Sequence, residues 1–142
     1  MNIVFLSLGT NLGDKEKNLN DAIVQIQRRI GAVTAKSAFI QTEPWGFDSE
    51  NLFLNAAVKV ETILTPFEVL SQTQRIETDM GRISKSVNGE YHDRIIDIDI
   101  LMYFDSENCE GDGLHINTPD LTIPHPLMNE RDFVLIPLKQ IL

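Results

Sequence analysis

The stretch from His92 to Leu101 reads HDRIIDIDIL. Its isoleucines at positions 96, 98 and 100 alternate with Asp97 and Asp99, which is the period-two pattern of a β-strand with one apolar face. The two carboxylates therefore share the opposite face. Because an unpaired buried carboxylate is very costly, that face has to be solvated, paired or bound to a metal ion.

Two aspartates at positions i and i+2 of a strand can supply hard oxygen ligands to Mg²⁺, which prefers one or two carboxylates together with phosphate oxygens and water. The alternative is an ordinary solvent-exposed sheet face, which is the commoner explanation of an isolated pair. Here Arg94, His92 and a polar loop come directly before the pair. This setting favours a site for a metal ion and a polyphosphate.

The length and composition favour one domain spanning residues 1–142, with 42% hydrophobic residues to form its core. Twenty-one acidic residues stand against 12 basic ones, for a formal net charge of −9, which argues against nucleic-acid and membrane-surface partners. Cys109 is the single cysteine, so an intrachain disulfide and a CxxC metal site are both excluded. The first residues lack the features of a signal peptide. We therefore expect a soluble cytoplasmic protein.

Hydrophobic periodicity and breaker residues predict the secondary structure. The expected strands are Ile3–Leu8, Val33–Gln41, Phe53–Glu61 and the Asp97–Asp99 strand. The expected helices run from Asp14 to Gly31, from Thr65-Pro66 to Gly81 with Phe67, Val69, Leu70, Thr73 and Ile76 on its apolar face, and over Phe133–Leu142. Residues 105–113 look like a hairpin tip. The order βαββαβ predicts an α+β ferredoxin-like fold, in which helices pack on a mostly antiparallel sheet.

The second helix and the loop after it carry further polar candidates. Gln74 and Glu77 lie one turn apart on the same helix face. Arg82 lies near the helix end, where either the helix dipole or a phosphate explains it equally well. The loop from Arg82 to Arg94 also carries Lys85 and can bring positive charge over a polyphosphate, as lids in phosphoryl transfer do. A plain disordered loop is the alternative.

Two more stretches suggest ligand contacts. Phe53 and Asn55 share one strand face after the loop TEPWGF, and an aromatic ring beside an amide suits a flat heteroaromatic ligand. Phe53 taken alone is more often a core residue. His125 lies between two prolines, followed by Arg131 and Phe133. A rigid loop with a histidine and an arginine fits phosphate contact, although a capping or surface role explains either residue singly.

Six motifs occur in order along the chain: SLGTNLGD, TEPWGF, FLNAAV, TQRIETDMGR, RIIDIDIL and LTIPHPLMNERDF. Together they resemble the 6-hydroxymethyl-7,8-dihydropterin pyrophosphokinases of folate biosynthesis, over nearly the whole chain. The resemblance implies a ferredoxin-like fold and the use of ATP with two Mg²⁺ ions. It also implies transfer of a pyrophosphoryl group to the hydroxymethyl oxygen of the pterin, with release of AMP.

The resemblance assigns residues by matching motifs. It implies that Asp97 and Asp99 hold the metal ions and that Arg82 and Arg94 neutralise charge on the transferred group. The implied pterin site is Thr42, Pro44, Trp45, Gly46, Phe53, Asn55, Asp97 and Phe133. The implied ATP site is Gln74, Glu77, Lys85, Tyr91, Arg94, the backbone near Ile100, Thr122, His125 and Arg131.

The chain departs from the family pattern at several positions. Tyr91 stands where a tryptophan is common, Ser84 replaces a basic residue so that Lys85 is the nearest substitute, and Asp120 and Pro126 stand where an arginine and an aromatic residue can contact ATP. Two other functions fit the same residues. One is a different Mg-dependent nucleotidyl or phosphoryl transferase, and the other is a non-catalytic module that binds a nucleotide or metabolite. For the pyrophosphokinase, the expected partners are the small molecules ATP and hydroxymethyl dihydropterin, and the expected state is a monomer.

Overall fold

The computed structural model describes residues 1–42, 52–81 and 95–142. Its elements, in chain order, are β1 (Asn2–Thr10), α1 (Lys15–Arg29), β2 (Gly31–Lys36), β3 (Ile40–Thr42), β4 (Phe53–Thr62), α2 (Pro66–Asp79), β5 (Asp97–Phe104), β6 (Ile116–Asn117), β7 (Thr122–Ile123) and α3 (Asp132–Lys139).

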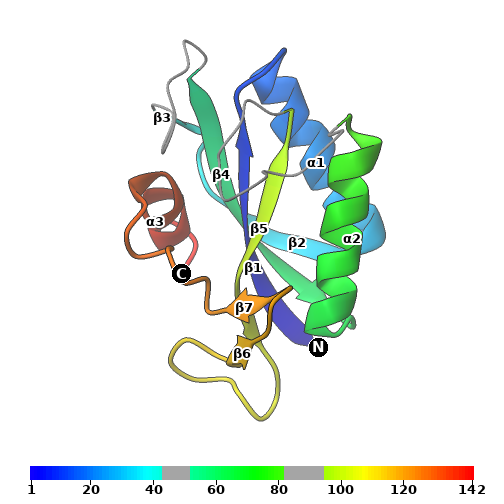
Figure 1. The fold of residues 1–142 in the computed structure, drawn as a ribbon, viewed down its shortest axis with the longest axis vertical. Coiled ribbons are helices and arrows are strands. Elements are labelled where there is room, and N and C mark those ends of the chain that lie inside the picture. Colours follow the sequence, from blue (N-terminus) through cyan, green and yellow to red (C-terminus); the bar gives the residue numbers. More distant parts are fainter. Residues whose placement is uncertain (43–51, 82–94) are drawn as a thin grey trace.

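The main sheet has the strand order β2-β4-β1-β5, with β3 paired to β4 outside this path. All of its pairings are antiparallel. The crossovers through α1 and α2 place the first and last strands of the βαββαβ unit side by side, as Figure 1 shows. The predicted ferredoxin-like α+β fold is confirmed.

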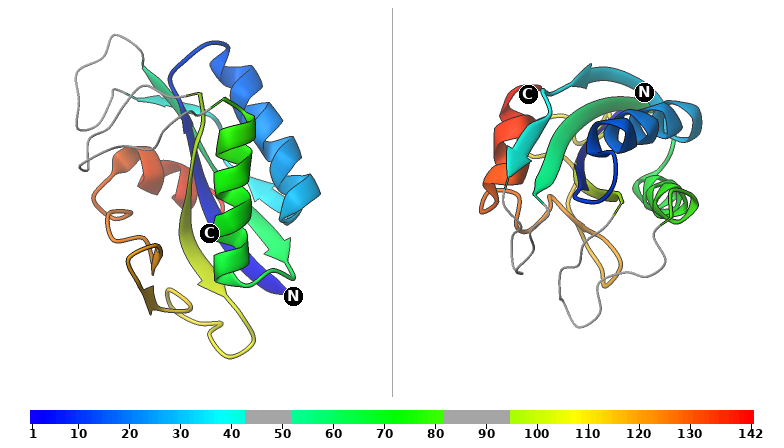
Figure 2. Two further views of the ribbon diagram at one scale, coloured as in Figure 1. Left: turned by 45° about the vertical axis from the view of Figure 1, so that its right-hand side comes forward. Right: turned by 90° about the horizontal axis from the view of Figure 1, so that it is seen from above.

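Helices cover both faces of this sheet. Helices α1 and α2 lie on one face and α3 lies on the other, which is clear in Figure 1 and in both views of Figure 2. The large core cluster joins apolar residues of α1 and α2 to the isoleucines at positions 96, 98 and 100. A smaller cluster under α3 joins Phe5, Leu101 and Met102 to Val134 and Leu138. The face with Asp97 and Asp99 is therefore the α3 face.

The helix starts follow from local sequence. The Asp14 side chain accepts the Lys17 backbone N–H at 3.1 Å and caps α1. Thr65 and Glu68 form a complete capping box at the start of α2, where Pro66 occupies the first turn. These side chains satisfy backbone N–H groups that have no partner within the helix. This is why both starts were predicted within a residue or two.

A β-bulge interrupts β5 at Leu101. In the ladder with β1, Phe5 faces Met102 while Leu6 faces Ile100, so Leu101 is the extra residue. A bulge lets two successive side chains fall on the same face, and Leu101 and Met102 both join the cluster under α3. Strict alternation would have placed Met102 among the isoleucines. The bulge thus places two apolar side chains toward the C-terminal end of β5, on the face that carries Asp97 and Asp99.

The predicted strand Val33–Gln41 was wrong as a single element, because it is broken into β2 and β3. The break is at Ser37, whose hydroxyl accepts the Ala57 backbone N–H at 2.9 Å, while the Ser37 N–H donates to the Ala57 carbonyl. Phe67 was also predicted wrongly, since its side chain is 47% exposed rather than packed on the apolar face of α2.

Residues 105–113 do form a turn after β5, and the Leu114 N–H returns to the Tyr103 carbonyl at 2.8 Å. The next strand, β6, pairs with β7 instead of β5 and forms a separate two-stranded sheet. The terminal helix is shorter than expected and ends at Lys139. Within the three described ranges, no helix has the length and apolar character needed to span a membrane.

Candidate active site

A row of three residues crosses the centre of the aspartate face. Gly9 in β1 is paired with Asn55 in β4 on one side and with Asp97 in β5 on the other. Paired residues of adjacent strands point to the same face of a sheet. Adjacent strands are about 4.8 Å apart, so the Asn55 and Asp97 backbones are separated by roughly 10 Å. Gly9 contributes no side chain between Asn55 and Asp97, and this position is called the gap above Gly9.

The first predicted aromatic residue lies beside this gap. A Cβ on Gly9 would come within 3.2 Å of Asn55 Oδ1 and 3.6 Å of Phe53 Cδ1. Asn55 is buried and its Nδ2 donates to Thr42 Oγ1 at 2.7 Å and to the Ile40 carbonyl at 3.2 Å. The structure thus brings together Thr42, Phe53, Asn55 and Asp97, all predicted for the pterin side.

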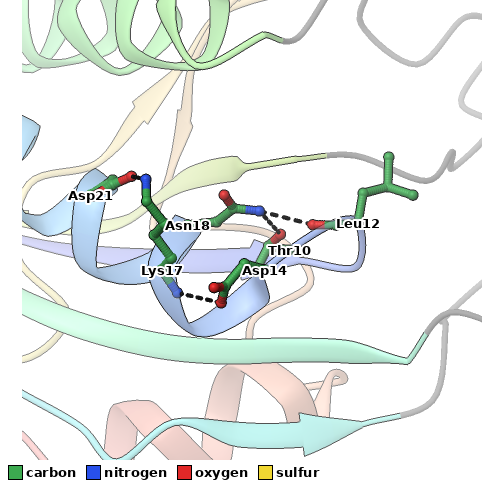
Figure 3. A network of polar contacts seen from close by, with 6 residues as sticks. All are labelled: Thr10, Leu12, Asp14, Lys17, Asn18 and Asp21. Atoms are coloured by element: carbon green, nitrogen blue, oxygen red, sulfur yellow. Dashed lines mark hydrogen bonds and ion pairs between the residues drawn. The ribbon is translucent and has the colours of Figure 1, made fainter.

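The turn that follows Gly9 is held by a polar network, drawn in Figure 3. Asn18 Nδ2 on α1 donates to Thr10 Oγ1 at 3.2 Å and to the Leu12 carbonyl at 2.8 Å. Nearby, Lys15 Nζ donates to the Leu52 carbonyl at 3.0 Å, just before Phe53. The start of α1 therefore fixes the backbone on two sides of the gap above Gly9.

Gly9 is the residue of this site that sequence reasoning did not single out. The SLGTNLGD motif contained it, but a glycine inside an apolar strand carries no chemical group. The available signal was positional, because glycine in a strand interior often marks a close approach of another group. Its importance depends on Asn55 and Asp97, which are far from it in the sequence.

A cavity of about 260 Å³ lies beside the outer edge of β5. Its walls come from α2, from β5 and from the segment around β7, and comprise Leu70, Ile98, Asp99, Ile100, Pro119, Asp120, Leu121, Thr122, His125 and Pro126. Asp99 therefore links the aspartate face to the cavity. Of the residues predicted for the ATP side, Ile100, Thr122 and His125 line it.

His125 is held in one orientation by backbone hydrogen bonds. Its own N–H donates to the Leu101 carbonyl at 2.8 Å, so the bulge anchors the loop. Its Nδ1 accepts the Leu127 N–H at 3.2 Å, which leaves the remaining proton of a neutral ring on Nε2. The pKa of His125 is lowered from 6.5 to about 4, chiefly by burial and also by the positive charge of Arg131, while Asp97 opposes both effects. Neutral His125 is thus a hydrogen-bond donor through Nε2 at pH 7.

This pKa shift predicts how stability depends on pH. Between pH 6.5 and 4 an unfolded chain protonates His125 while the folded protein does not, so the free energy of unfolding should fall as the pH falls through this window. We expect a loss on the order of 1 kcal/mol, after allowance for solvent screening of the ring. Denaturant unfolding at several pH values should show a flatter profile for His125→Asn, with exposed His115→Asn as the matched control. Parallel profiles for wild type and His125→Asn would contradict the prediction.

Arg131 and Phe133 form a contact at the start of α3. The Arg131 guanidinium carbon lies 5.5 Å from the centroid of the Phe133 ring, within the range of a cation–π interaction. Arg131 is buried at 5% exposure, and its charge acts on His125. This arginine therefore stands between the aromatic ring predicted for the pterin side and the histidine predicted for the ATP side.

The two α2 candidates differ in their surroundings. Glu77 is buried at 4% exposure, and its Oε2 accepts the Ile98 backbone N–H at 2.9 Å. Gln74 is half-buried and lies one helical turn beyond Leu70, a cavity-wall residue. The remaining predicted site residues lie outside the described ranges: Pro44, Trp45, Gly46, Arg82, Lys85, Tyr91 and Arg94.

Comparison with protein families gives the decisive match. The family described as "7,8-dihydro-6-hydroxymethylpterin-pyrophosphokinase (HPPK)" matches residues 5–142. The chain belongs to this family. The resemblance drawn from the six sequence motifs is confirmed over almost the full length of the chain.

Individual pyrophosphokinases support the same conclusion. The chain is 45% identical to the 2-amino-4-hydroxy-6-hydroxymethyldihydropteridine pyrophosphokinase of Porphyromonas gingivalis, over 99% of this chain and 91% of that protein. It is 40% identical to the protein of the same name from Bacillus subtilis, over 99% of this chain and 78% of that protein. Both relatives are thus covered for most of their length.

Solved structures confirm the fold. The wild-type HPPK-DHPS protein of Plasmodium falciparum superimposes with a TM-score of 0.66 at 17% sequence identity. The alignment covers 99% of this chain and 40% of that chain, so this pyrophosphokinase chain corresponds to well under half of the Plasmodium protein. At this identity the likeness bears on the fold alone.

Proposed function

We infer that this chain transfers pyrophosphate from ATP to the hydroxymethyl group of 6-hydroxymethyl-7,8-dihydropterin, giving AMP and the pterin diphosphate in folate biosynthesis. The observation that carries this inference is the position of the family's aspartate pair. Asp97 lies beside the gap above Gly9 and Asp99 lines the cavity next to it. The pair of carboxylates thus lies between the position above Gly9, where Phe53 and Asn55 meet, and the cavity beside β5, as a reaction between two small molecules requires.

We propose that Asp97 and Asp99 hold Mg²⁺. Both side chains are half-buried on one strand face, and the described part of the chain contains no group of three or more His, Cys, Asp or Glu residues suited to a metal ion. Two carboxylates on one strand face fit Mg²⁺, because this ion prefers one or two carboxylates and takes its remaining ligands from water and phosphate oxygens. The count of two ions comes from the family resemblance. When bound, the metal supplies positive charge to the phosphate oxygens.

The ATP side is proposed to be the cavity beside β5. Thr122 and neutral His125 offer hydrogen-bond donors there, the Ile100 backbone lies at its wall, and Arg131 supplies the nearby positive charge. Gln74 is placed to reach the same space from α2. Asp120, which replaces an arginine of the family pattern, lines the same cavity.

The pterin side is proposed to be the gap above Gly9. Phe53 and Phe133 offer ring faces for stacking, and the amide of Asn55 lies between β3 and β1 with Thr42 beside it. Pro44, Trp45 and Gly46 are proposed for the edge of the pterin from sequence alone. Such a site uses aromatic faces for affinity and polar groups at the edge for specificity.

The reaction needs position and charge more than covalent chemistry. The hydroxymethyl oxygen forms a bond to the β-phosphorus of ATP, the bond from that phosphorus to the α–β bridging oxygen breaks, and AMP leaves with the bridging oxygen. The residues of this chain hold the two substrates in line. Arg82 and Arg94, with Lys85 and Tyr91 in the same loop, are proposed from the sequence to cover the phosphates as a lid.

The direct test is AMP release from ATP with and without the hydroxymethyl pterin. The pyrophosphokinase function predicts AMP formation that depends on both the pterin and Mg²⁺. AMP formed with other acceptors but not with the pterin would indicate a different transferase. Binding of ATP without AMP formation under any condition would indicate a regulatory module.

We further propose that the protein is a cytoplasmic monomer and that its partners are small molecules.

A further inference from the structure

Glu77 is a buried charged residue whose contact points to the strand of the aspartate pair. It lies in the last turn of α2, is 4% exposed, and its Oε2 accepts the Ile98 N–H at 2.9 Å. Ile98 is the residue between Asp97 and Asp99. The Glu77 carboxylate thus binds the backbone of the residue that lies between the two aspartates.

The position of β5 in the sheet explains why this backbone needs a partner. Among the residues that the structure describes, β5 is the end strand of the order β2-β4-β1-β5 and has a strand neighbour on one side only. In an antiparallel ladder, alternate residues turn their N–H and C=O groups away from the neighbouring strand. Ile98 is one of these, and its outward N–H is satisfied by Glu77. An end strand without such contacts is held less firmly.

The acceptor of this hydrogen bond is a carboxylate and not a neutral group. Glu77 is buried in the last turn of α2, and Asp97 and Asp99 are the residues on either side of Ile98. A glutamine in its place would offer the same N–H an oxygen without the charge.

We propose that Glu77 is a positioning residue for the carboxylate pair: it fixes the Ile98 peptide, and through it the directions in which Asp97 and Asp99 project. Ionised carboxylates make strong hydrogen bonds to backbone N–H groups, which suits a strand that must hold its shape while the charge beside it changes. Glu77 reaches Ile98 from α2, at the edge of β5 that borders the cavity, and this backbone contact takes the place of the ATP contact that the family resemblance implied for it. The inference rests on the proposed Mg²⁺ site of Asp97 and Asp99.

Two substitutions separate these roles. Glu77→Gln keeps an oxygen that can accept the Ile98 N–H, whereas Glu77→Ala removes it. We expect the Ile98 amide of Glu77→Ala to exchange its hydrogen at least tenfold faster than that of wild type in the unliganded protein, and kcat for AMP release to fall about tenfold with little change in the KM for ATP, the scale seen when the support of a metal ligand is lost. Glu77→Gln should keep the Ile98 amide protected, and its kcat should fall less than that of Glu77→Ala. Glu61→Gln removes the same charge from an exposed site and serves as the matched control.

Several results would overturn the proposal. Unchanged Ile98 exchange in Glu77→Ala would show that the hydrogen bond does not hold the strand. A raised KM for ATP at normal kcat would assign Glu77 to ATP instead. If Glu77→Ala does not fold, Glu77→Gln decides, because a tenfold loss of kcat with a protected Ile98 amide means that the charge acts directly. A wild-type protein that releases no AMP would count against the proposed function, whereas the exchange measurement tests the strand contact by itself.

Discussion

Replacing Asp97 or Asp99 by asparagine should leave the protein folded and lower turnover by a hundredfold or more. Asparagine keeps the size of the side chain and removes the charge that a hard cation requires, and loss of one key electrostatic group typically costs this much in rate. Both carboxylates are half-buried on the same face of β5 and belong to neither hydrophobic core cluster, so we expect a substitution of equal size to leave the core packing intact. AMP release at saturating ATP and pterin measures the effect.

The size of this effect separates a metal ligand from a surface residue. Asp21→Asn, a change on the exposed side of α1 where Asp21 pairs with Lys17, is the matched control and should stay within about twofold of wild type, as surface changes usually do. Each variant should also need more Mg²⁺ for half-maximal rate. A folded Asp97→Asn or Asp99→Asn protein with near-normal turnover would remove the metal assignment, and circular dichroism establishes the folding.

Phe53→Ala should weaken pterin binding by about 1–3 kcal/mol, or roughly 5- to 150-fold in Kd, which is the scale of one stacked and buried ring. The affinity for ATP should change little, because Phe53 lies beside Gly9 in β1 while the cavity lies at the outer edge of β5. Calorimetry with each ligand separately measures the two affinities.

The neighbouring residue supplies the control for Phe53. Leu54 points to the opposite face and packs against the large core cluster, so Leu54→Ala should lower the free energy of unfolding and affect the two ligands alike. Phe53→Leu keeps apolar volume without the ring and should fall between wild type and Phe53→Ala. Equal losses of pterin and ATP affinity in Phe53→Ala would indicate a core role for Phe53 instead.

The sequence predicted most of the candidate site because the polar and aromatic residues of the site lie in short motifs. Asp97 and Asp99 share a face through the simple alternation of a strand, and Phe53 with Asn55 does the same in β4. The helix caps at Asp14 and Thr65 could be predicted because each capping side chain binds a backbone N–H only three residues further along the chain. These features depend on neighbours in the chain.

Other features could not be read because they depend on partners far away in the sequence. Ser37 breaks a strand through hydrogen bonds to Ala57, and the bulge at Leu101 is defined by its register with Phe5 and Leu6. Phe67 follows the helical period closely enough to be predicted buried, yet its side chain is 47% exposed in the described part of the chain. The contacts that decide the strand break and the bulge therefore join residues that lie far apart in the sequence.

For this protein the sequence alone determined the family, the fold class, the helix starts and the pairing of the two aspartates on one face, since each follows from local periodicity, capping or motif order. Only the tertiary structure decided that Gly9 lies between Asn55 and Asp97, that Arg131 stacks on Phe133, and that the Glu77 carboxylate accepts the Ile98 N–H. The physical reason is that β5 is an end strand. The outward N–H of Ile98 donates to Glu77 of α2, and the carbonyl of Leu101 accepts the N–H of His125 in the loop before α3. Both partners lie 21 or more residues away in the sequence.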